Sequence, residues 1–296
     1  MEGILNMEKK TAVTYNGTMS QVGDLRVMRL LPNRYTRTVG PFFFLDHLIP
    51  TEVKPKKAKA PDGSFAHPHR GIATFTYLFS GELEHFDSRG HHGIVGSGGA
   101  QWMKAGNGVI HDENPTQAFQ EKGGLLHGLQ FWINLPAKNK AEPPDYLAVQ
   151  GEDFPAIELP GNTGRLKVLI GEYEDKKSHV QTYSRQFNYH LQLNSKASFT
   201  FNVHSDFESA AFIADGEVMI NGSAHKKGEL LVFDIDGSEI HIVNTGETAA
   251  DVMLFGGEGY TESIVAEGPF VMNSESEIGL AYREFYSGNY GKISYR

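Results

Sequence analysis

Cysteine is absent from this sequence, so the chain can form neither a disulfide framework nor a zinc site built from thiolates. Long apolar runs are absent as well. No stretch approaches the ~18–20 apolar residues of a membrane helix, and no basic segment followed by an apolar stretch opens the chain. We therefore expect a soluble protein of the cytoplasm, or of the nucleus in a eukaryote, that does not associate with membranes.

Positive charge is scarce and scattered. Lys and Arg number 27 against 36 Asp and Glu, a formal charge of −9, and the nearest approach to a basic cluster is the local segment Lys54–Lys59. A protein that binds nucleic-acid phosphates needs a basic stripe to neutralise them. Direct nucleic-acid binding is therefore disfavoured, whereas the acidic balance is compatible with a protein partner.

Length and glycine content indicate the architecture. Single cores stop growing near ~250–300 residues and domains cluster near ~100–150, so 296 residues predict two domains of similar size. Glycine accounts for 33 of the 296 residues, about 11% against a usual ~7%. A glycine-rich chain with modest charge predicts many short strands joined by turns.

Short runs rich in β-branched and aromatic residues recur along the chain, and turn-forming pairs separate many of them. The runs are Ile72–Phe79, Gly128–Leu135, Arg165–Ile170, His190–Leu193, Ser198–Val203, Ala210–Ala214, Leu230–Phe233 and Asp251–Phe255. The turn pairs are Ser80–Gly81, Asp215–Gly216, Asn221–Gly222 and Asp236–Gly237. Strands at this spacing predict an all-β sandwich or barrel.

The chain divides into three parts. We expect one barrel over residues 1–135, a connection rich in Pro and Lys over 136–160, and another barrel over 161–296 that ends in a helix. The apolar spacing within Ser274–Tyr286 predicts that helix. A loose echo between Tyr77–Glu84 and Ala211–Val218, each an apolar strand entering a Gly-Glu turn, indicates two barrels of one type.

Two short motifs carry the chemistry. Residues 66–71 read A-H-P-H-R-G, and residues 110–115 read I-H-D-E-N-P. In a strand, residues i and i+2 point to the same face, so His67 pairs with His69 and His111 with Glu113, while Asp112 should point away. Pro68 cannot donate to a ladder, which predicts a strand start, a bulge or an edge. An isolated H-x-H occurs often by chance, but two such pairs in an all-β chain predict four ligands around one metal.

The donor set narrows the choice of metal. Three neutral imidazoles and one carboxylate suit Fe, Mn, Ni, Cu or Zn better than Mg or Ca, and ligand type alone does not choose among the five. A six-coordinate metal would keep two open positions, as non-haem iron sites that activate oxygen require. The set is therefore typical of a reactive metal centre rather than a closed structural zinc site.

Five segments resemble the pirins, a family within the cupin superfamily. They read G-P-F-F-F-L-D-H, H-P-H-R-G, Q-W-M-K-A-G-N-G-V-I-H-D-E, H-G-L-Q-F-W-I-N-L and G-P-F-V-M-N, at Gly40–His47, His67–Gly71, Gln101–Glu113, His127–Leu135 and Gly268–Asn273. The resemblance implies two tandem cupin barrels, double-stranded β-helices of the jelly-roll type. It also implies one iron, as Fe(II), held in the N-terminal barrel by His67, His69, His111 and Glu113.

Two features bear on how far this resemblance extends. Most pirins carry Glu where this chain has Ala73, which implies unchanged metal binding with altered tuning around the metal. The C-terminal part has no H-x-H, because His190, His204, His225 and His241 are single. The resemblance implies that this second barrel is degenerate and metal-free, and that it serves as packing partner and lid.

The resemblance implies a quercetin 2,3-dioxygenase-like activity, in which O₂ opens the ring of a flavonol or related enol and carbon monoxide is released. Glu113 would be the catalytic residue, accepting the proton of the substrate hydroxyl. The alternative is a non-catalytic, metal-dependent redox sensor that modulates a transcription factor or metabolic enzyme. The family resemblance implies a monomer.

Other residues receive structural interpretations. We expect His91 and His92 in an exposed turn, His85 and Asp87 as a surface pair, Trp102 and Met103 in the core, and His127 as a hydrogen-bonded structural histidine. Neither a G-x-S-x-G elbow nor a phosphate-binding G-x-x-x-x-G-K-S/T loop is apparent. Hydrolase and nucleotidase activities therefore have no motif to support them.

Overall fold

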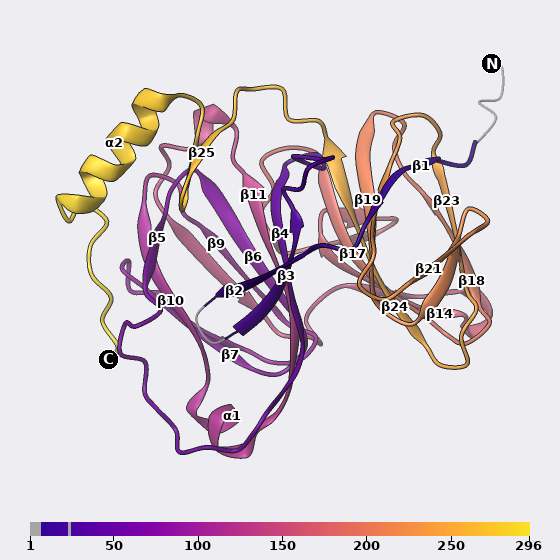
Figure 1. Cartoon of the computed structure of the whole chain (residues 1–296), viewed down its shortest axis with the longest axis horizontal. Helices are drawn as coiled ribbons and strands as arrows, with labels where there is room; N and C mark the ends of the chain where they lie inside the picture. Colours follow the sequence, from indigo (N-terminus) through magenta and orange to yellow (C-terminus); the bar gives the residue numbers. More distant parts are fainter. Residues whose placement is uncertain (1–6, 23–24) are drawn as a thin grey trace. The chain divides into compact units, whose positions relative to one another are not determined.

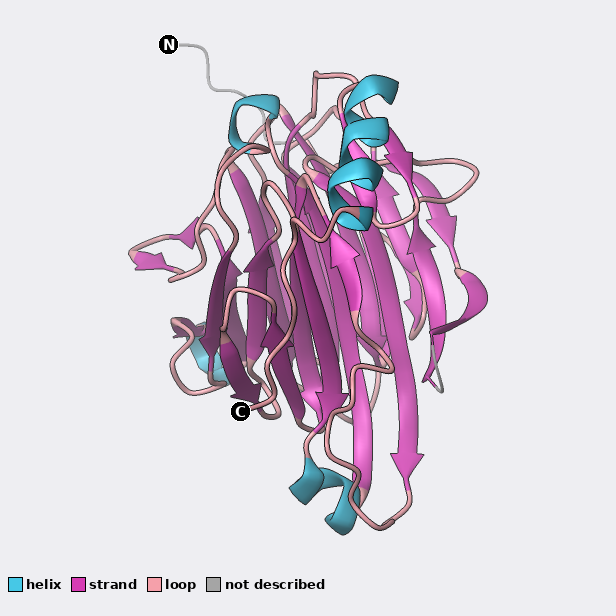
Figure 2. Ribbon diagram, turned by 90° about the vertical axis from the view of Figure 1, so that its left-hand side faces the viewer, coloured by secondary structure: helices cyan, strands magenta, loops and turns pink. Residues whose placement is uncertain are grey.

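The structure is a computed structural model and describes residues 7–22 and 25–296. Strands dominate these residues (Figure 2), and the described α-helices are α1, Gln117–Lys122, and α2, Glu275–Tyr286. The all-β prediction is confirmed. The terminal helix is also confirmed, with Ser274 as its N-cap. None of the described helices has the length and apolar character needed to cross a membrane.

The described residues form two compact units. The first, here called the histidine unit, contains residues 19–22, 25–29, 43–153 and 261–296, and the second, the companion unit, contains residues 7–18, 30–42 and 154–260. This division differs from the predicted one at both ends of the chain. Residues 7–18 belong to the companion unit, and residues 261–296 belong to the histidine unit. Helix α2 packs Ile278 and Ala281 against Phe270 and Met272 of the histidine unit. Apolar periodicity predicts a helix but not the core that receives it.

Residues 136–160 are more ordered than a connection. They contain the 3-10 turn η1, Ala137–Asn139, and strand β12, Asp145–Val149, which pairs with β9 of the histidine unit. Strand β13, Ala156–Glu158, pairs with β14 of the companion unit. The units divide between Asp153 and Phe154, and Pro155 lies between β12 and β13, which belong to different sheets.

The histidine unit has a seven-stranded and a four-stranded sheet. The larger has the order β12-β9-β6-β11-β4-β3-β2 and adds to β12 the strands Ala100–Lys104 (β9), Ile72–Ser80 (β6), Gly124–Asn134 (β11), Phe42–Val53 (β4), Leu25–Leu31 (β3) and Thr18–Val22 (β2). The smaller has the order β5-β10-β7-β8, formed by His67–His69, Val109–Pro115, Leu83–Asp87 and His92–Val95. Strands β25, Val265–Glu267, and β26, Phe270–Met272, form a hairpin.

The companion unit repeats this plan. Its larger sheet has the order β1-β22-β19-β24-β17-β14-β13. Besides β13, the strands are Thr11–Tyr15 (β1), Leu230–Phe233 (β22), Phe207–Asp215 (β19), Ala250–Glu258 (β24), Gln186–Leu193 (β17) and Gly164–Ile170 (β14). Its smaller sheet has the order β18-β23-β20-β21, formed by Ser198–Asn202, Glu239–Asn244, Glu217–Ile220 and Ser223–Lys226. The remaining elements are η2, Pro160–Asn162, and a β-ribbon, Glu172–Tyr173 (β15) with Lys176–Lys177 (β16).

The internal echo in the sequence falls on matching elements. In each unit it covers the end of a central strand of the larger sheet, β6 or β19, the turn at Gly81 or Gly216, and the first part of a strand of the smaller sheet, β7 or β20. Both glycines have a positive φ, of 101° and 92°, which L-residues with a side chain rarely adopt. The same turn therefore leads the chain from one sheet to the other in both units.

The two units fill their interiors differently. In the companion unit the small sheet contributes Phe201, Val218, Ile220, Ile240 and Ile242 to one large apolar cluster. The corresponding strands of the histidine unit, β5 and β10, carry the two predicted ligand pairs instead (Figure 1). One unit is thus closed by apolar packing, whereas the other keeps polar side chains inside.

Gly71 joins the H-P-H-R-G motif to the C-terminal segment. The Arg70 carbonyl accepts a hydrogen bond from Val271 N, and Lys140 Nζ donates to the carbonyls of Gly71 and Val271 at 2.7 and 2.8 Å. Gly71 has φ +80°, and a Cβ there would lie 2.0 Å from the Val271 carbonyl oxygen. Only glycine fits this close approach next to the ligand strand.

We expect Gly71→Ala to destabilise the protein more than Gly90→Ala. Gly90 has a similar φ, +89°, but a Cβ added there would meet no atom within 4 Å, so it measures the backbone cost alone, about 1–2 kcal/mol. The collision at Gly71 adds a further ~1–3 kcal/mol. Thermal unfolding of both variants tests this prediction. Equal shifts in Tm would show that the segment around Val271 can move away from the added Cβ without loss of stability.

Candidate metal centre

Three imidazoles converge where the edge strand β5 pairs with β10. The antiparallel register sets His111 opposite His67, and the Nε2 atoms of these two residues lie 3.0 Å apart. The ring centroid of His69 lies 4.8 Å from that of His67 and 5.0 Å from that of His111. The structure therefore brings the three predicted histidines into one group of potential ligand atoms, and β5 is the edge strand that Pro68 predicts.

Backbone carbonyl groups accept hydrogen bonds from the Nδ1 atoms of two of the three rings. His67 Nδ1 lies 2.8 Å from the Phe65 carbonyl oxygen, and His69 Nδ1 lies 3.2 Å from that of Pro269. A carbonyl can only accept, so each Nδ1 carries a hydrogen, and Nε2 is the nitrogen that a metal could use. Histidine ligands of metals are commonly oriented in this way.

Burial sets the protonation state of the inner two histidines. Desolvation lowers the pKa of His69 and of His111 well below the usual value of an imidazole, and the neighbouring His67 lowers both further. Both rings are therefore neutral, which is the form that binds metals. His111 Nδ1 is buried without a hydrogen-bond partner among the described residues. Neutral, convergent nitrogen donors fit a divalent transition-metal ion.

Glu113 lies on the other side of His111. Its closest approach to that ring joins Oε2 to Nδ1 at 4.0 Å, and with His85 and His111 it forms a second, overlapping group of potential ligands. Gln130 Nε2 donates to Glu113 Oε2 at 2.9 Å, and Thr76 Oγ1 donates to Oε1 at 3.2 Å, where Gln101 Nε2 also donates. Neutral donors thus hold the Glu113 carboxyl group beside the three histidines.

The residues that hold Glu113 form a row that sequence reasoning missed. Gln101, Thr76 and Gln130 stand opposite one another on β9, β6 and β11 of the larger sheet. Each interrupts an otherwise apolar strand, as in A-Q-W-M, T-F-T-Y and G-L-Q-F. A polar residue on the buried face of a strand requires a partner, so these interruptions were the signal available.

The predicted surface pair of His85 and Asp87 is wrong. Both residues are only 1% exposed, because β7 lies between β10 and β8 and turns this face inward. The His85 ring stacks on Tyr146 at 4.2 Å between centroids, and Asp87 accepts a 2.8 Å hydrogen bond from His91 Nδ1. His92 is exposed, as expected, but it begins strand β8 rather than lying in a turn, and it pairs with Glu84. His91 is half-buried and not exposed as predicted.

The other structural interpretations are confirmed. Trp102 and Met103 are buried in the core. His127 is buried, stacks on Phe79 and lies 2.9 Å from His47 between Nε2 atoms. Asp112 lies fully buried between His111 and Glu113, and its carboxylate accepts from Tyr295 and Asn114 instead of joining the ligand group.

The position that departs from the pirin pattern, Ala73, lies buried within β6, opposite Ile133 and Lys104 on the neighbouring strands. In the described part of the companion unit, the single histidines form no group of three ligands. Each has a local partner: His190 with Asp251, His204 with Asp206, His225 with Glu229, and His241 with Thr200. Neither Ala73 nor these histidines of the companion unit therefore belong to the three-histidine group.

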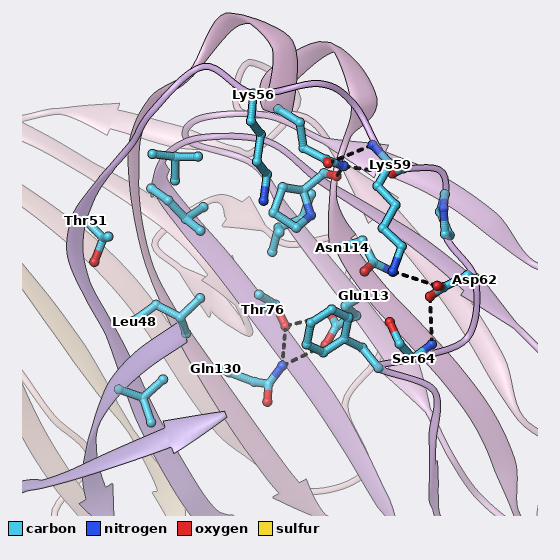
Figure 3. A pocket seen from close by; sticks show the side chains of 18 of the residues that line it. Leu48, Thr51, Lys56, Lys59, Asp62, Ser64, Thr76, Glu113, Asn114 and Gln130 are labelled. Atoms are coloured by element: carbon cyan, nitrogen blue, oxygen red, sulfur yellow. Dashed lines mark hydrogen bonds and ion pairs between the residues drawn. The ribbon is translucent and has the colours of Figure 1, made fainter. Parts of the chain in front are cut away.

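A cavity of about 550 Å³ opens beside the histidines. Figure 3 shows Thr76, Glu113 and Gln130 close together in it, with dashed hydrogen bonds between them. His67 also lines the cavity, and the apolar part of the lining consists of Val27, Leu48, Val53, Ala60, Pro61, Phe65, Leu83, Pro115 and Leu126. A small molecule in this cavity would meet Glu113 and His67 together.

The C-terminal segment supports both ligand strands. Next to His69, Arg70 pairs with Glu284 and donates to the Tyr290 hydroxyl at 3.3 Å. Between His111 and Glu113, Asp112 accepts a 2.7 Å hydrogen bond from the Tyr295 hydroxyl. The positions of the ligands thus depend on residues near the end of the chain.

Two barrels of one plan, with paired histidines on the small sheet of one of them, define a cupin protein with two cupin domains. Comparison with known families agrees. The Pirin family profile matches residues 24–133, and the profile of the Pirin C-terminal cupin domain matches residues 188–291. The chain belongs to the pirin family.

Individual relatives extend the comparison. A quercetin 2,3-dioxygenase from Acinetobacter baumannii of known crystal structure is 32% identical with a TM-score of 0.90, covering 97% of this chain and 100% of that chain. A Pseudomonas aeruginosa relative that bears the provisional name quercetin 2,3-dioxygenase is 30% identical over 286 residues, 96% of this chain and 99% of its own. A bacterial pirin from Escherichia coli in complex with nickel(II) is 19% identical with a TM-score of 0.62, covering 84% and 100%, and shares the fold.

We expect Tyr295→Phe to weaken divalent-metal binding, because the buried Asp112 carboxylate loses a hydrogen bond between two candidate ligands. Partners of this kind typically change metal affinity by roughly 10–100-fold. Competition with a chelating dye measures the affinity, and Tyr286→Phe, at an exposed tyrosine of α2, is the control. A lower Tm with unchanged affinity would instead indicate a purely structural bond.

Proposed function

We propose that the histidine unit is a metal-dependent dioxygenase that acts on a flavonol such as quercetin or on a related enol. His67, His69 and His111 would hold Fe(II), and Glu113 would complete the ligand set. The observation that carries the proposal is the convergence of three imidazoles, two of them neutral through burial, next to the Glu113 carboxyl group and a mainly apolar cavity. The Acinetobacter and Pseudomonas relatives support the same activity.

Iron bound there would supply Lewis acidity towards an enol oxygen and an electron-transfer partner for O₂. Nitrogen donors also accept Zn, Mn, Ni or Cu, and the Escherichia coli pirin was solved with nickel(II). The donor set therefore supports a transition metal as a class, and iron is the member that the resemblance to the pirins implies.

Glu113 would be the base that takes the proton of the enol hydroxyl. An ionised carboxylate only accepts hydrogen bonds and has about four lone-pair sites, of which Thr76, Gln101 and Gln130 use three. One site remains, so Glu113 would have to leave the metal in order to accept the proton of a substrate in the cavity that it lines. The same neutral donors fix the position of the carboxyl group.

The cavity walls would position the substrate and limit water. Apolar side chains on several strands surround the space, and Phe65 lies two residues before His67. A planar aromatic enol gains free energy by covering this surface, about 25 cal/mol for each Å² of apolar area removed from water. Exclusion of water also strengthens the electrostatic contacts at Glu113.

Metal content tests the ligand assignment. We expect about one metal per chain in the wild-type protein purified without chelators, and close to none in His69→Ala, because a buried ligand is lost. His241→Ala serves as the control, since His241 lies in the companion unit and bonds to Thr200. Elemental analysis measures both variants, and retention of a full metal complement by His69→Ala would refute the site.

O₂ uptake with quercetin tests the role of Glu113. In the iron-loaded protein we expect Glu113→Gln to lower turnover by roughly 10²–10⁴-fold, the usual contribution of a general base. Glu121→Gln, at an exposed residue of α1, should leave turnover unchanged. Full turnover by a metal-loaded Glu113→Gln enzyme would exclude the base. Absence of uptake by the loaded wild type would favour the redox-sensing alternative.

A further inference from the structure

The charged side chains of the cavity are arranged unevenly. Three of the six Asp, Glu and Lys residues that line it belong to ion pairs: Asp46 forms a bidentate pair with Arg29, and Lys59 pairs with Asp62 at 2.7 Å. Glu113 is held by neutral donors, as described above. Two charged residues that line the cavity, Lys56 and Glu52, take part in no side-chain ion pair or hydrogen bond with the described residues.

Lys56 enters the cavity from a segment whose backbone is fixed. Figure 3 shows its side chain directed into the space that Glu113 and Gln130 also line. The backbone N–H of Lys56 donates to the Gln120 carbonyl at 2.9 Å. The buried side chain of Gln120 accepts from Lys59 N and donates to the Lys59 carbonyl, each at 3.1 Å. The Lys56 ammonium is therefore a cation without a partner among the described residues, on a well-anchored segment.

The cavity thus offers three kinds of surface to one ligand. The candidate metal ligands and Glu113 suit an acidic hydroxyl, the apolar lining suits an aromatic ring, and the ammonium of Lys56 suits an anion. An ammonium binds a carboxylate through charge-assisted hydrogen bonds, which are stronger than neutral ones. A simple flavonol would satisfy the first two surfaces and leave the third unused.

We propose that the cavity selects an aromatic enol that bears a carboxylate, and that Lys56 is the residue that recognises this second group. The inference rests on the proposed function for the binding of the enol end, and it adds the class of substrate. Glu52 lines the same cavity with the opposite charge and would oppose the carboxylate. Selectivity is therefore set by the balance between Lys56 and Glu52.

Equilibrium binding to the zinc-loaded protein tests the proposal without turnover. The probes are 3-hydroxyflavone and its 4′-carboxylate, and the readout is the ratio of their Kd values. Because the side chains of Lys56 and Glu52 are exposed to solvent, we expect the wild type to favour the carboxylate by about 2–5-fold, in the range of an exposed ammonium–carboxylate pair. Higher ionic strength should reduce the preference.

Three variants separate the charges. Lys56→Gln should abolish the preference with little change in the Kd of 3-hydroxyflavone, and Glu52→Gln should increase it. Lys57→Gln is the matched control, because Lys57 is an exposed neighbour that does not line the cavity. The proposal is overturned if Lys56→Gln keeps the wild-type ratio, if Lys57→Gln loses it equally, or if neither probe binds the wild type.

The outcomes distinguish this inference from the proposed function. A charge preference that depends on Lys56, in a protein whose iron form consumes no O₂, would retain the binding class and reject the dioxygenase. O₂ uptake by the iron form together with an unchanged ratio in Lys56→Gln would retain the dioxygenase and reject the role of Lys56.

Discussion

The pairing of β5 with β10 is the interaction on which the site depends. Strand β5 has only three residues, and Pro68 at its centre cannot donate a hydrogen bond to its neighbour. The register nevertheless sets His67 opposite His111 and turns His69 to the same side. A shift of one residue would turn either strand's pair of candidate ligands to the opposite face. The close contacts around Gly71 and Asp112 restrict such a shift from both ends of the ligand group.

The two units show what the same strand plan does with different side chains. In the companion unit, Thr200 faces His241 on β18 and β23, and the neighbouring Phe201 and Ile240 enter the apolar core. In the histidine unit, the corresponding strands carry imidazoles and a carboxylate, which need partners when buried. Gln101, Thr76 and Gln130, on the larger sheet, are the partners of the Glu113 carboxyl group. The larger sheet of the histidine unit therefore carries polar partners for the candidate ligands of the smaller sheet. In the companion unit, side chains from both sheets form one apolar core.

The sequence alone predicted the strand-rich fold and the repeated plan, because these follow from alternation along a strand and from turn spacing. It also predicted four ligands around one metal, of which the structure groups His67, His69 and His111 and places Glu113 in a second group that shares only His111. It did not predict which unit receives each end of the chain, since apolar periodicity in α2 does not identify its packing partner. It also placed His85 and Asp87 at the surface, because alternation defines a shared face but not which face is covered. The row that holds Glu113 required knowledge of the strand order β9-β6-β11, which brings together residues 76, 101 and 130.

The supports of His69 and Asp112 come from residues 269–295, and this has a consequence for the order of assembly during translation. The histidine motifs leave the ribosome early, but their last supports follow only after the whole of residues 154–260 has been synthesised. The nascent histidine unit must therefore exist for some time with its ligand strands incompletely fixed. Residues 269–295 act as the final piece of the site, and a chain without Tyr295 would have both barrels but would lack this support of Asp112.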